Sequence, residues 1–217
     1  MKKAILFDLD GVIVNTAVYH YRAWKRLADE EGIYFDRQIN ERLKGVSRRK
    51  SLDIILERSE KEYSEFEKEK MCERKNKWYA DSVVELERDE ILPGIMEFLC
   101  WLKERNYFTA LCSASRNAGK IIYALELESY FDCIVDAATL KKQKPDPEIF
   151  VRAAQKFGKE NNECVVVEDS FAGIHAAVSA GMHTIGIGDA ETLKEAELIV
   201  SDTAGENFEI IKKWLQK

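Results

Sequence analysis

Acidic, hydroxyl and basic side chains gather at four places along this 217-residue sequence, three of them directly after a short apolar run. In chain order they are Asp8 and Asp10, Ser113 to Ser115, Lys144, and Glu168 and Asp169. Taken singly, each group is more typical of a turn, a helix cap or a solvated loop. The carboxyl ends of strands form the ligand crevice of an open α/β sheet, so we expect the groups together at one sheet edge. So many carboxylates would repel one another without a cation.

A divalent cation would relieve this repulsion, and carboxylate and carbonyl oxygens are the ligands that Mg²⁺ prefers. A magnesium site of this kind indicates a phosphate substrate. A carboxylate can attack phosphorus and form an aspartyl phosphate, while the metal and a lysine neutralise charge on the transferring oxygens. Asp10, two residues after Asp8, can instead serve the attacking or leaving oxygen as general acid and base.

Short apolar runs alternate with amphipathic helical patterns along most of the chain. The first run, Ala4 to Phe7, is typical of a strand buried on both faces of a parallel sheet. Further strands are expected at 108–112, 133–135, 164–167 and 184–187, with helices at 94–105, 117–125, 147–157 and 171–180. This alternation predicts an α/β fold, a doubly wound parallel sheet with a Rossmann-like core.

The first two runs are separated by 100 residues, and about seventy of these, 16–83, show no strand signal, although a crossover between parallel strands needs only a dozen or so. Helical patterns cover 16–31, 37–43, 47–57 and 62–83. The excess predicts an inserted helical cap domain at 16–83, and a catalytic α/β core at 1–15 and 84–217. The insert carries 16 Lys and Arg against 14 Asp and Glu, although the whole chain has a net charge of -6. A basic cap over an acidic core suits a phosphorylated ligand held against a metal.

Composition narrows the class of protein. The net charge of -6 argues against a general affinity for nucleic acid or for an anionic membrane. No window approaches the roughly 20 apolar residues of a membrane span, and Asp8 follows the start too soon for a signal peptide. We therefore expect a cytoplasmic protein. The five cysteines are scattered without paired metal-ligand spacing, which argues against a zinc site.

The four groups resemble the motifs of the haloacid dehalogenase superfamily of phosphotransferases in order and in spacing. The matching residues are Asp8-Leu9-Asp10-Gly11-Val12, Ser113, Lys144-Pro145 and Glu168-Asp169-Ser170. Within the superfamily the sequence is similar to the β-phosphoglucomutase family, at 8–16 with His20 and Trp24, and at 43–48, 74–76 and 113–117. That family converts β-glucose 1-phosphate to glucose 6-phosphate through β-glucose 1,6-bisphosphate, and its helical cap follows the first strand.

The resemblance implies roles for the core residues. Asp8 becomes the phosphorylated nucleophile and Asp10 the acid and base. The implied ligands of Mg²⁺ are Asp8, the backbone carbonyl of Asp10, Glu168 and Asp169. The residues implied to hold the transferring phosphoryl group are Ser113, Ala114 and Lys144. Those implied to hold the distal, non-reacting phosphate are Arg48 from the cap and Ser115, Arg116 and Asn117 from the core.

In the cap, the resemblance places a further set of residues near the sugar or the hinge. Positions that contact or flank the sugar are Lys44, Gly45, Val46, Ser51 and Lys75, and the hinge and cap groups that couple closure to Asp10 are Thr16 and His20. On sequence alone, His20 and Trp24 are more typical of a helix interior. Gly45 permits close backbone approach and Ser47 is typical of an N-cap. The helix that carries Arg48 is therefore expected to present a cation and free N–H groups where a phosphate could bind.

Two departures from the family pattern leave the chemistry intact: Asn15 replaces the usual Asp, and Arg116 a common Lys. We interpret the chain as a magnesium-dependent sugar phosphomutase, working as a monomer on a phosphorylated sugar, with β-glucose 1,6-bisphosphate as activator and intermediate. A small-molecule phosphatase of the same superfamily would share the core and use water as the acceptor. A non-catalytic binding or regulatory protein would have no need of the complete set Asp8, Asp10, Lys144, Glu168 and Asp169.

Overall fold

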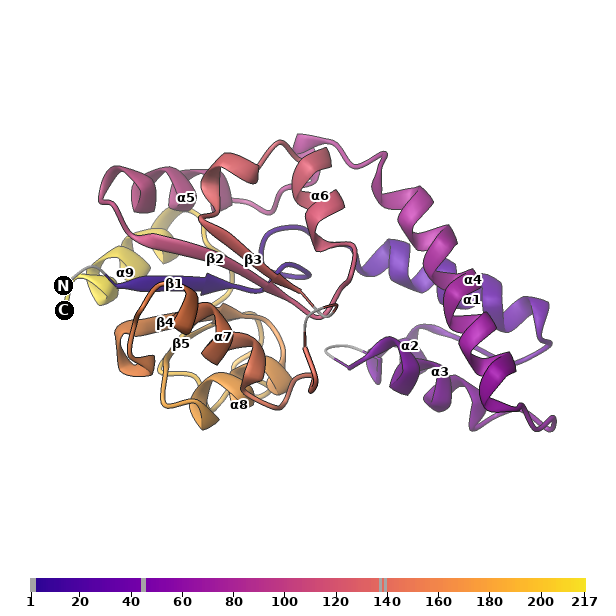
Figure 1. Cartoon of the computed structure of the whole chain (residues 1–217). Helices are drawn as coiled ribbons and strands as arrows, with labels where there is room; N and C mark the ends of the chain where they lie inside the picture. The colour runs from indigo at the N-terminus through magenta and orange to yellow at the C-terminus, as the bar shows by residue number, and fades with distance from the viewer. Residues whose placement is uncertain (1–2, 44–45, 137, 139) are drawn as a thin grey trace.

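The centre of the molecule is a parallel sheet of six strands in the order β3-β2-β1-β4-β5-β6 (Figure 1). The computed structural model describes residues 3–43, 46–136, 138 and 140–217. The strands are β1 (Ala4–Phe7), β2 (Phe108–Ser113), β3 (Cys133–Asp136), β4 (Cys164–Glu168), β5 (His183–Ile187) and β6 (Leu198–Val200). The chain first builds the sheet from β1 toward β3 and then from β4 toward β6, so the winding reverses between β1 and β4.

Alternate residues of β1 point to opposite faces of the sheet, and helices cover both faces. Ile5 and Phe7 pack in one hydrophobic core, which includes residues of α5 (Ile95–Glu104), α6 (Ala118–Ala124) and α9 (Gly205–Leu215). Ala4 and Leu6 pack in another, with residues of α7 (Glu148–Lys156) and α8 (Phe171–Ser179). Because both faces are buried, the strand is apolar throughout. The doubly wound α/β fold expected from the sequence is confirmed.

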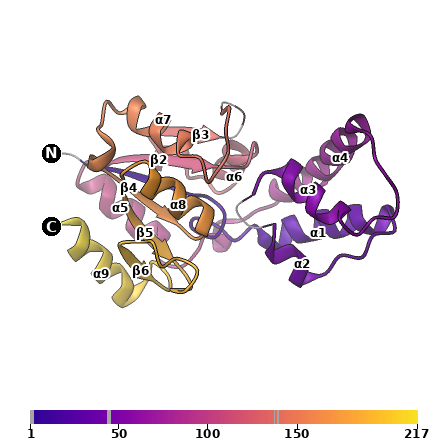
Figure 2. The same cartoon turned by 90° about the horizontal axis from the view of Figure 1, so that it is seen from below.

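The chain between β1 and α5 forms a group of helices at one end of the sheet (Figures 1 and 2). These helices are α1 (Ala17–Glu30), α2 (Arg37–Glu41), α3 (Arg48–Leu56) and α4 (Glu65–Val83). Their apolar side chains form a hydrophobic cluster of their own, around residues such as Trp24 and Leu52. We call residues 16–83 the helical insert. It begins one residue before α1 and ends with the last residue of α4, and its status as a separate domain stays a prediction.

Local signals in the sequence determine where the helices of the insert begin. The Ser47 hydroxyl accepts a hydrogen bond from the Lys50 backbone N–H, which caps α3. Ser64 and Glu67 form a capping box at the start of α4. The cap thus fixes Arg48 as the first residue of α3.

The two segments that join the insert to the sheet lie side by side. Val14 forms a parallel bridge with Asp10 and an antiparallel bridge with Ile91. The Leu92 backbone N–H donates to the Ile13 carbonyl at 2.9 Å. The chain that leaves the sheet after β1 is thus hydrogen-bonded to the chain that returns before α5.

The five expected strands are confirmed, each within one residue at either end. The sequence pattern did not predict β6 or α9, at the C-terminal end of the chain. Short 3₁₀ helices lie at η1 (Arg88–Glu90), η2 (Glu128–Tyr130) and η3 (Asn161–Glu163). Within the described residues, no helix combines the length and the apolar character needed to cross a bilayer.

Candidate active site

The candidate site lies where the winding of the sheet reverses. Asp8 directly follows β1, and Glu168 is the last residue of the neighbouring strand β4. The Asp8 backbone N–H donates to the Val167 carbonyl at 2.9 Å, which continues the pairing of these strands to the site. Both carboxylates are buried. Parallel pairing therefore brings two carboxylates that are 160 positions apart in the sequence to one sheet edge.

Lys144 joins these two carboxylates. Its Nζ lies 2.5 Å from Asp8 Oδ1 and 2.7 Å from Glu168 Oε1, and it also donates to the Cys112 carbonyl at 3.2 Å. Burial lowers the pKa of Lys144, but the two carboxylates outweigh burial and hold its pKa above the usual value. Burial also raises the pKa of Asp8 to about 7, against the opposing charge of Lys144. The lysine offsets only part of the negative charge at this sheet edge.

Asp169 adds a third carboxylate to the group. Ligand oxygens of Asp8, Glu168 and Asp169 all lie within 4.8 Å of one another. Burial, followed by the charges of Glu168 and Asp8, raises the pKa of Asp169 to about 9. Three crowded carboxylates with one ammonium group are a donor set that suits a hard divalent cation. These residues therefore fit Mg²⁺.

Two glycines make room for these carboxylates. Gly11 has φ +82°, and a Cβ on it would lie 1.9 Å from Asp169 Oδ2. A Cβ on Gly173 would lie 1.8 Å from Glu168 Oε1. Glycine is required at both positions because any side chain would displace a carboxylate of the site.

Asp10 lies apart from these three carboxylates. It is not one of the three residues whose ligand oxygens lie within 4.8 Å of one another. The Thr16 hydroxyl, which is fully buried, donates a hydrogen bond to Asp10 Oδ1. Burial raises the pKa of Asp10, whereas the Thr16 bond and the charges of Lys144 and Lys75 lower it. The hydrogen bond from Thr16 thus ties the Asp10 carboxyl group to the first residue of the insert.

The loop after β2 is ordered by its own hydroxyl groups. Ser113 Oγ accepts from the Ser115 N–H at 3.0 Å, and Ser115 Oγ accepts from the Asn117 N–H at 3.2 Å. Asn117 then reaches the insert, where its Nδ2 donates to Asn76 Oδ1 at 2.9 Å. Between these residues, Ala114 is half-buried and Arg116 is exposed. The loop therefore connects the sheet edge with the insert.

A buried cation lies in the insert. Lys75 is 2% exposed, and its Nζ lies 2.8 Å from His20 Nδ1. The ammonium group also lies over two rings, 4.8 Å from the centre of Trp24 and 4.6 Å from that of Tyr79. Burial and the charge of Arg48 lower the pKa of Lys75 to about 7. Burial, followed by the charges of Lys75 and Arg48, lowers the pKa of His20 well below its usual value.

Arg48 is half-buried at the start of α3. Burial lowers its pKa, and the positive charge of Arg116 from the sheet side acts in the same direction. The next residue differs, because Arg49 forms ion pairs with Asp53 and Glu65. Within the described part of the chain, neither Arg48 nor Arg116 has a carboxylate partner at ion-pair distance. Two arginines from separate parts of the molecule thus lack a counter-ion among the described residues.

The structure places the remaining expected residues as follows. Ser51 is buried in α3, and Val46 packs at the edge of the insert's hydrophobic cluster. Lys44 and Gly45 lie outside the described residues. Two residues near the site were missed: Tyr79, which stacks on His20, and Asn76, which accepts a hydrogen bond from Asn117. A signal for Tyr79 existed, since it lies four positions after Lys75 and therefore on the same face of α4.

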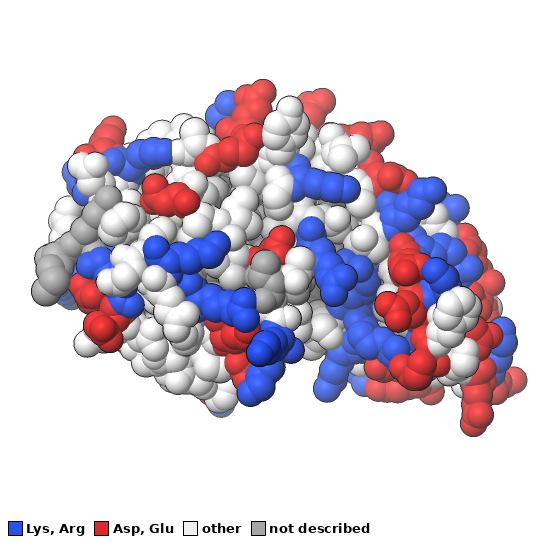
Figure 3. Space-filling model, in the orientation of Figure 1, with Lys and Arg blue, Asp and Glu red and all other residues white. Residues whose placement is uncertain are grey.

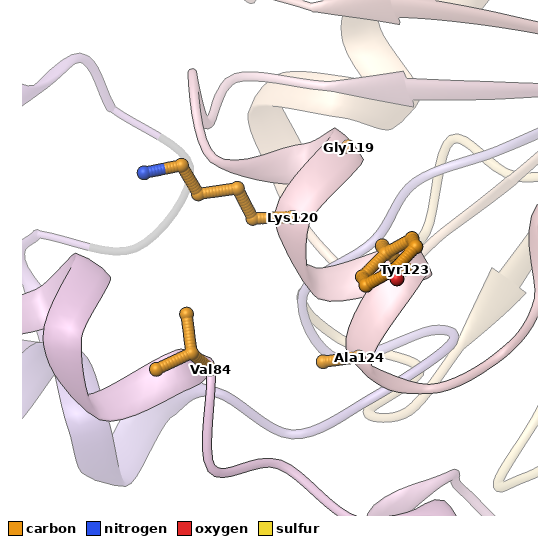
Figure 4. A pocket seen from close by; sticks show the side chains of 5 residues that line it. All are labelled: Val84, Gly119, Lys120, Tyr123 and Ala124. Carbon is orange, nitrogen blue, oxygen red and sulfur yellow. The ribbon is translucent and has the colours of Figure 1, made fainter.

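Basic side chains gather along the boundary between the sheet and the insert (Figure 3). A separate hollow of about 500 Å³ lies on this boundary, between the end of α4 and α6 (Figure 4). Its lining consists of Val84, Gly119, Lys120, Tyr123 and Ala124. None of these lining residues is among those expected in the site, so the hollow is distinct from the carboxylate group.

Known proteins are similar to this chain in sequence and in fold. A family model for haloacid dehalogenase-like hydrolases matches residues 2–181. The chain is 44% identical to β-phosphoglucomutase of Bacillus subtilis, covering 99% of this chain and 96% of that protein. It is 30% identical to the phosphorylated carbohydrates phosphatase of Thermotoga maritima, covering 98% of this chain and 100% of that protein.

A solved structure agrees with these matches. The crystal structure of β-phosphoglucomutase from Clostridium difficile superimposes with a TM-score of 0.93 at 44% identity, covering 100% of this chain and 98% of that chain. The match spans the sheet and the helical insert. The chain therefore belongs to the haloacid dehalogenase-like hydrolase family and, within it, to the β-phosphoglucomutase family of enzymes.

Proposed function

We propose that this enzyme is a magnesium-dependent sugar phosphomutase that converts β-glucose 1-phosphate to glucose 6-phosphate. The observation that carries the proposal is the pair Arg48 and Arg116, from the insert and the sheet, which lack a carboxylate partner among the described residues. A phosphate group would supply the missing negative charge. A phosphomutase must hold a substrate that carries phosphate at each end in turn, so it needs a second phosphate site beside the reacting one. The 44% identity to a β-phosphoglucomutase supports this assignment.

Asp8 and Asp10 would divide the chemistry. In one half-reaction the Asp8 carboxylate attacks phosphorus, the bond between phosphorus and the sugar oxygen breaks, and Asp10 donates a proton to that oxygen. In the other, a sugar hydroxyl attacks the aspartyl phosphate, Asp10 accepts the hydroxyl proton, and Asp8 is released. Run on the two ends of the sugar, these steps form and consume β-glucose 1,6-bisphosphate.

The surrounding residues would hold the transferring group. Lys144, already 2.5 Å from Asp8, would offset the charge of the phosphoryl oxygens beside Ser113 and Ala114. The residues that would hold Mg²⁺ are Asp8, Glu168, Asp169 and the carbonyl of Asp10. When bound, the ion would supply positive charge against the transferring phosphoryl oxygens.

The insert and the loop after β2 would hold the rest of the substrate. Arg48, with Ser115, Arg116 and Asn117, would bind the distal phosphate. The hydrogen bond from Asn117 to Asn76 already links the two parts at this point. The residues that would flank the sugar are Lys44, Gly45, Val46, Ser51 and Lys75, with His20, Trp24 and Thr16 around them. Binding across both parts would favour a closed arrangement that excludes water from the aspartyl phosphate.

A second candidate function is hydrolysis of a sugar phosphate. It is favoured by the 30% identity to a phosphatase that acts on phosphorylated carbohydrates, over nearly the whole chain. Asp8 and Asp10 would have the same roles, but water would replace the sugar hydroxyl as the acceptor. The two candidates therefore differ in the fate of the phosphoryl group and agree on the first half-reaction.

One assay separates the candidates. The enzyme is incubated with β-glucose 1-phosphate, Mg²⁺ and a trace of β-glucose 1,6-bisphosphate, and glucose 6-phosphate and free phosphate are both followed. We expect glucose 6-phosphate to form with little free phosphate, and to require both Mg²⁺ and the bisphosphate. The α anomer of the substrate serves as a matched control. If free phosphate were released in an amount equal to the β-glucose 1-phosphate consumed, the phosphatase would be the correct assignment instead of the mutase.

A further inference from the structure

One buried hydroxyl close to Asp10 lacks a hydrogen-bond partner among the described residues. Within the part of the chain that the structure describes, Tyr79 Oη is the one buried side-chain oxygen or nitrogen without a hydrogen-bond partner. The side chain of Tyr79 is 1% exposed, so bulk water does not reach it. A buried polar group without a partner destabilises a fold, and such groups in native proteins call for an explanation.

The ring of Tyr79 is fixed by the insert. It stacks on His20, with ring centres 4.0 Å apart and an interplanar angle of 29°. Lys75 Nζ lies over the ring, 4.6 Å from its centre. Tyr79, His20 and Lys75 all belong to α1 and α4, the two longest helices of the insert. A movement of these helices would therefore move the Tyr79 hydroxyl with them.

The hydroxyl end of Tyr79 lies among groups that join the sheet to the insert. Burial, followed by the negative charge of Asp10, raises the pKa of Tyr79, while the hydroxyls of Thr16 and Ser115 oppose the rise. Neither hydroxyl meets Tyr79 Oη at hydrogen-bonding geometry. Thr16 already donates its own proton to Asp10, so its oxygen is free to accept another. A small shift of α4 would allow Tyr79 to donate to Thr16.

We propose that Tyr79 is a positioning residue for Asp10. In the closed arrangement the Tyr79 hydroxyl donates to Thr16, and Thr16 donates to Asp10, so that the carboxyl group is held toward the reacting sugar oxygen. Closure of the insert and orientation of the acid and base are then a single event. This inference rests on the proposed function, in which Asp10 exchanges a proton with the sugar oxygen.

The test compares two phosphoryl donors with different leaving groups in the variant Tyr79→Phe, which keeps the ring and removes only the hydroxyl. Transfer from β-glucose 1,6-bisphosphate to Asp8 needs a proton on the leaving sugar oxygen. Transfer from acetyl phosphate does not, because acetate leaves as an anion. We expect about a tenfold loss in kcat with the sugar donor, little change in KM, and unchanged phosphorylation by acetyl phosphate.

Two further variants keep the test decisive. Tyr63→Phe makes the same chemical change elsewhere in the insert, where the hydroxyl donates to Glu31, and should leave both donors unaffected. Thr16→Val removes the middle hydroxyl, and the double variant with Tyr79→Phe should lose no more activity than the more damaged single variant. Tyr79→Phe should melt no lower than the wild type, because it removes an unpartnered buried hydroxyl.

The outcomes separate this inference from the function on which it rests. Equal loss with both donors, or a lower melting temperature, would show that Tyr79 acts only in packing and would overturn the proposal. Unchanged kcat with the sugar donor, or additive losses in the double variant, would overturn it as well. If the wild type hydrolyses sugar phosphates instead of isomerising them, the proposed function fails, but the comparison of leaving groups still tests Tyr79.

Discussion

Two buried lysines, one at the sheet edge and one in the helical insert, have pKa values displaced in opposite directions. Lys144 contacts Asp8 and Glu168, and these carboxylates raise its pKa. Lys75 contacts His20 and two aromatic rings, and burial lowers its pKa to about 7. Lys144 is thus paired with carboxylates before any ligand arrives, although one ammonium group offsets only part of the negative charge of the three carboxylates. Among the described residues, Lys75 and Arg48 of the insert have no carboxylate at ion-pair distance, which suits a site that binds an anion.

The largest expected effect comes from a change at the sheet edge. Asp8→Asn removes the nucleophile, because an amide attacks phosphorus poorly, and it also removes a carboxylate from the metal group. We expect no phosphoenzyme and no turnover. Intact-mass measurement after incubation with acetyl phosphate and Mg²⁺ checks the first point, and the isomerase assay checks the second. Substantial mutase activity in this variant would exclude a covalent mechanism through Asp8.

Asp10→Asn should have the next largest effect. The nucleophile and its contact with Lys144 remain, but proton exchange with the sugar oxygen is lost, which typically costs a factor of 10² to 10⁴ in rate. Phosphorylation of Asp8 by acetyl phosphate should persist, and this serves as the internal control. If turnover fell by less than about tenfold, another group such as His20 would have to act as the base.

Arg48→Ala tests the arginine of the insert that has no carboxylate partner among the described residues. A charge-assisted hydrogen bond from arginine to phosphate is worth about 1.5 to 3 kcal/mol, so mutase efficiency should fall at least tenfold. Phosphorylation of Asp8 by acetyl phosphate needs no distal grip and should change far less. Arg49→Ala is the matched control, since Arg49 is already paired with Asp53 and Glu65. Equal losses in both reactions would indicate a structural role for Arg48, and no loss would contradict the distal phosphate site.

The smallest expected effect concerns stability. With a pKa of about 7 in the folded state against 10.5 in the unfolded state, Lys75 is protonated in both states below pH 7 and only in the unfolded state between these values. Because the unfolded state binds more protons in that window, the contribution of Lys75 to stability rises with pH from 7 to 10.5, by about 1 kcal/mol for each pH unit.

Urea unfolding of the wild type and of Lys75→Met at pH 7, 8 and 9 measures this difference. The wild type should gain stability relative to the variant as the pH rises. Lys77→Met, which changes an exposed lysine two positions away, should show no such trend. A pH-independent difference between wild type and Lys75→Met would mean that Lys75 is not displaced from its ordinary pKa, and the contrast with Lys144 would then be lost.

The sheet and its carboxylates were predictable because both follow from local patterns. A continuous apolar run such as Ala4 to Phe7 predicts a buried parallel strand, and parallel strands bring their carboxyl ends to one edge. Asp8, Glu168 and Asp169 therefore came together as expected. The strand β6, three residues long, and the helix α9 that follows it were not among the expected elements.

The environment of the insert was less predictable. The hydrogen bond from Asn117 to Asn76 and the stack of Tyr79 on His20 each join residues from different helices or loops. Which side chains meet there depends on how α1, α4 and the loop after β2 pack, and no spacing within one segment encodes that packing. The displaced pKa of Lys75 has the same origin, since it arises from burial among residues of other helices.

The paired linkers between the sheet and the insert have a mechanical consequence. Val14 bridges to Asp10 on one side and to Ile91 on the other, so both covalent connections pass through one narrow hydrogen-bonded strip. A body tethered by two adjacent strands can rotate about the line of the strip, but it cannot tumble freely. Any motion of the insert against the sheet is thus confined to few degrees of freedom. Docking the insert onto a bound ligand would then lose much less rigid-body entropy than capture by a lid on a single flexible tether.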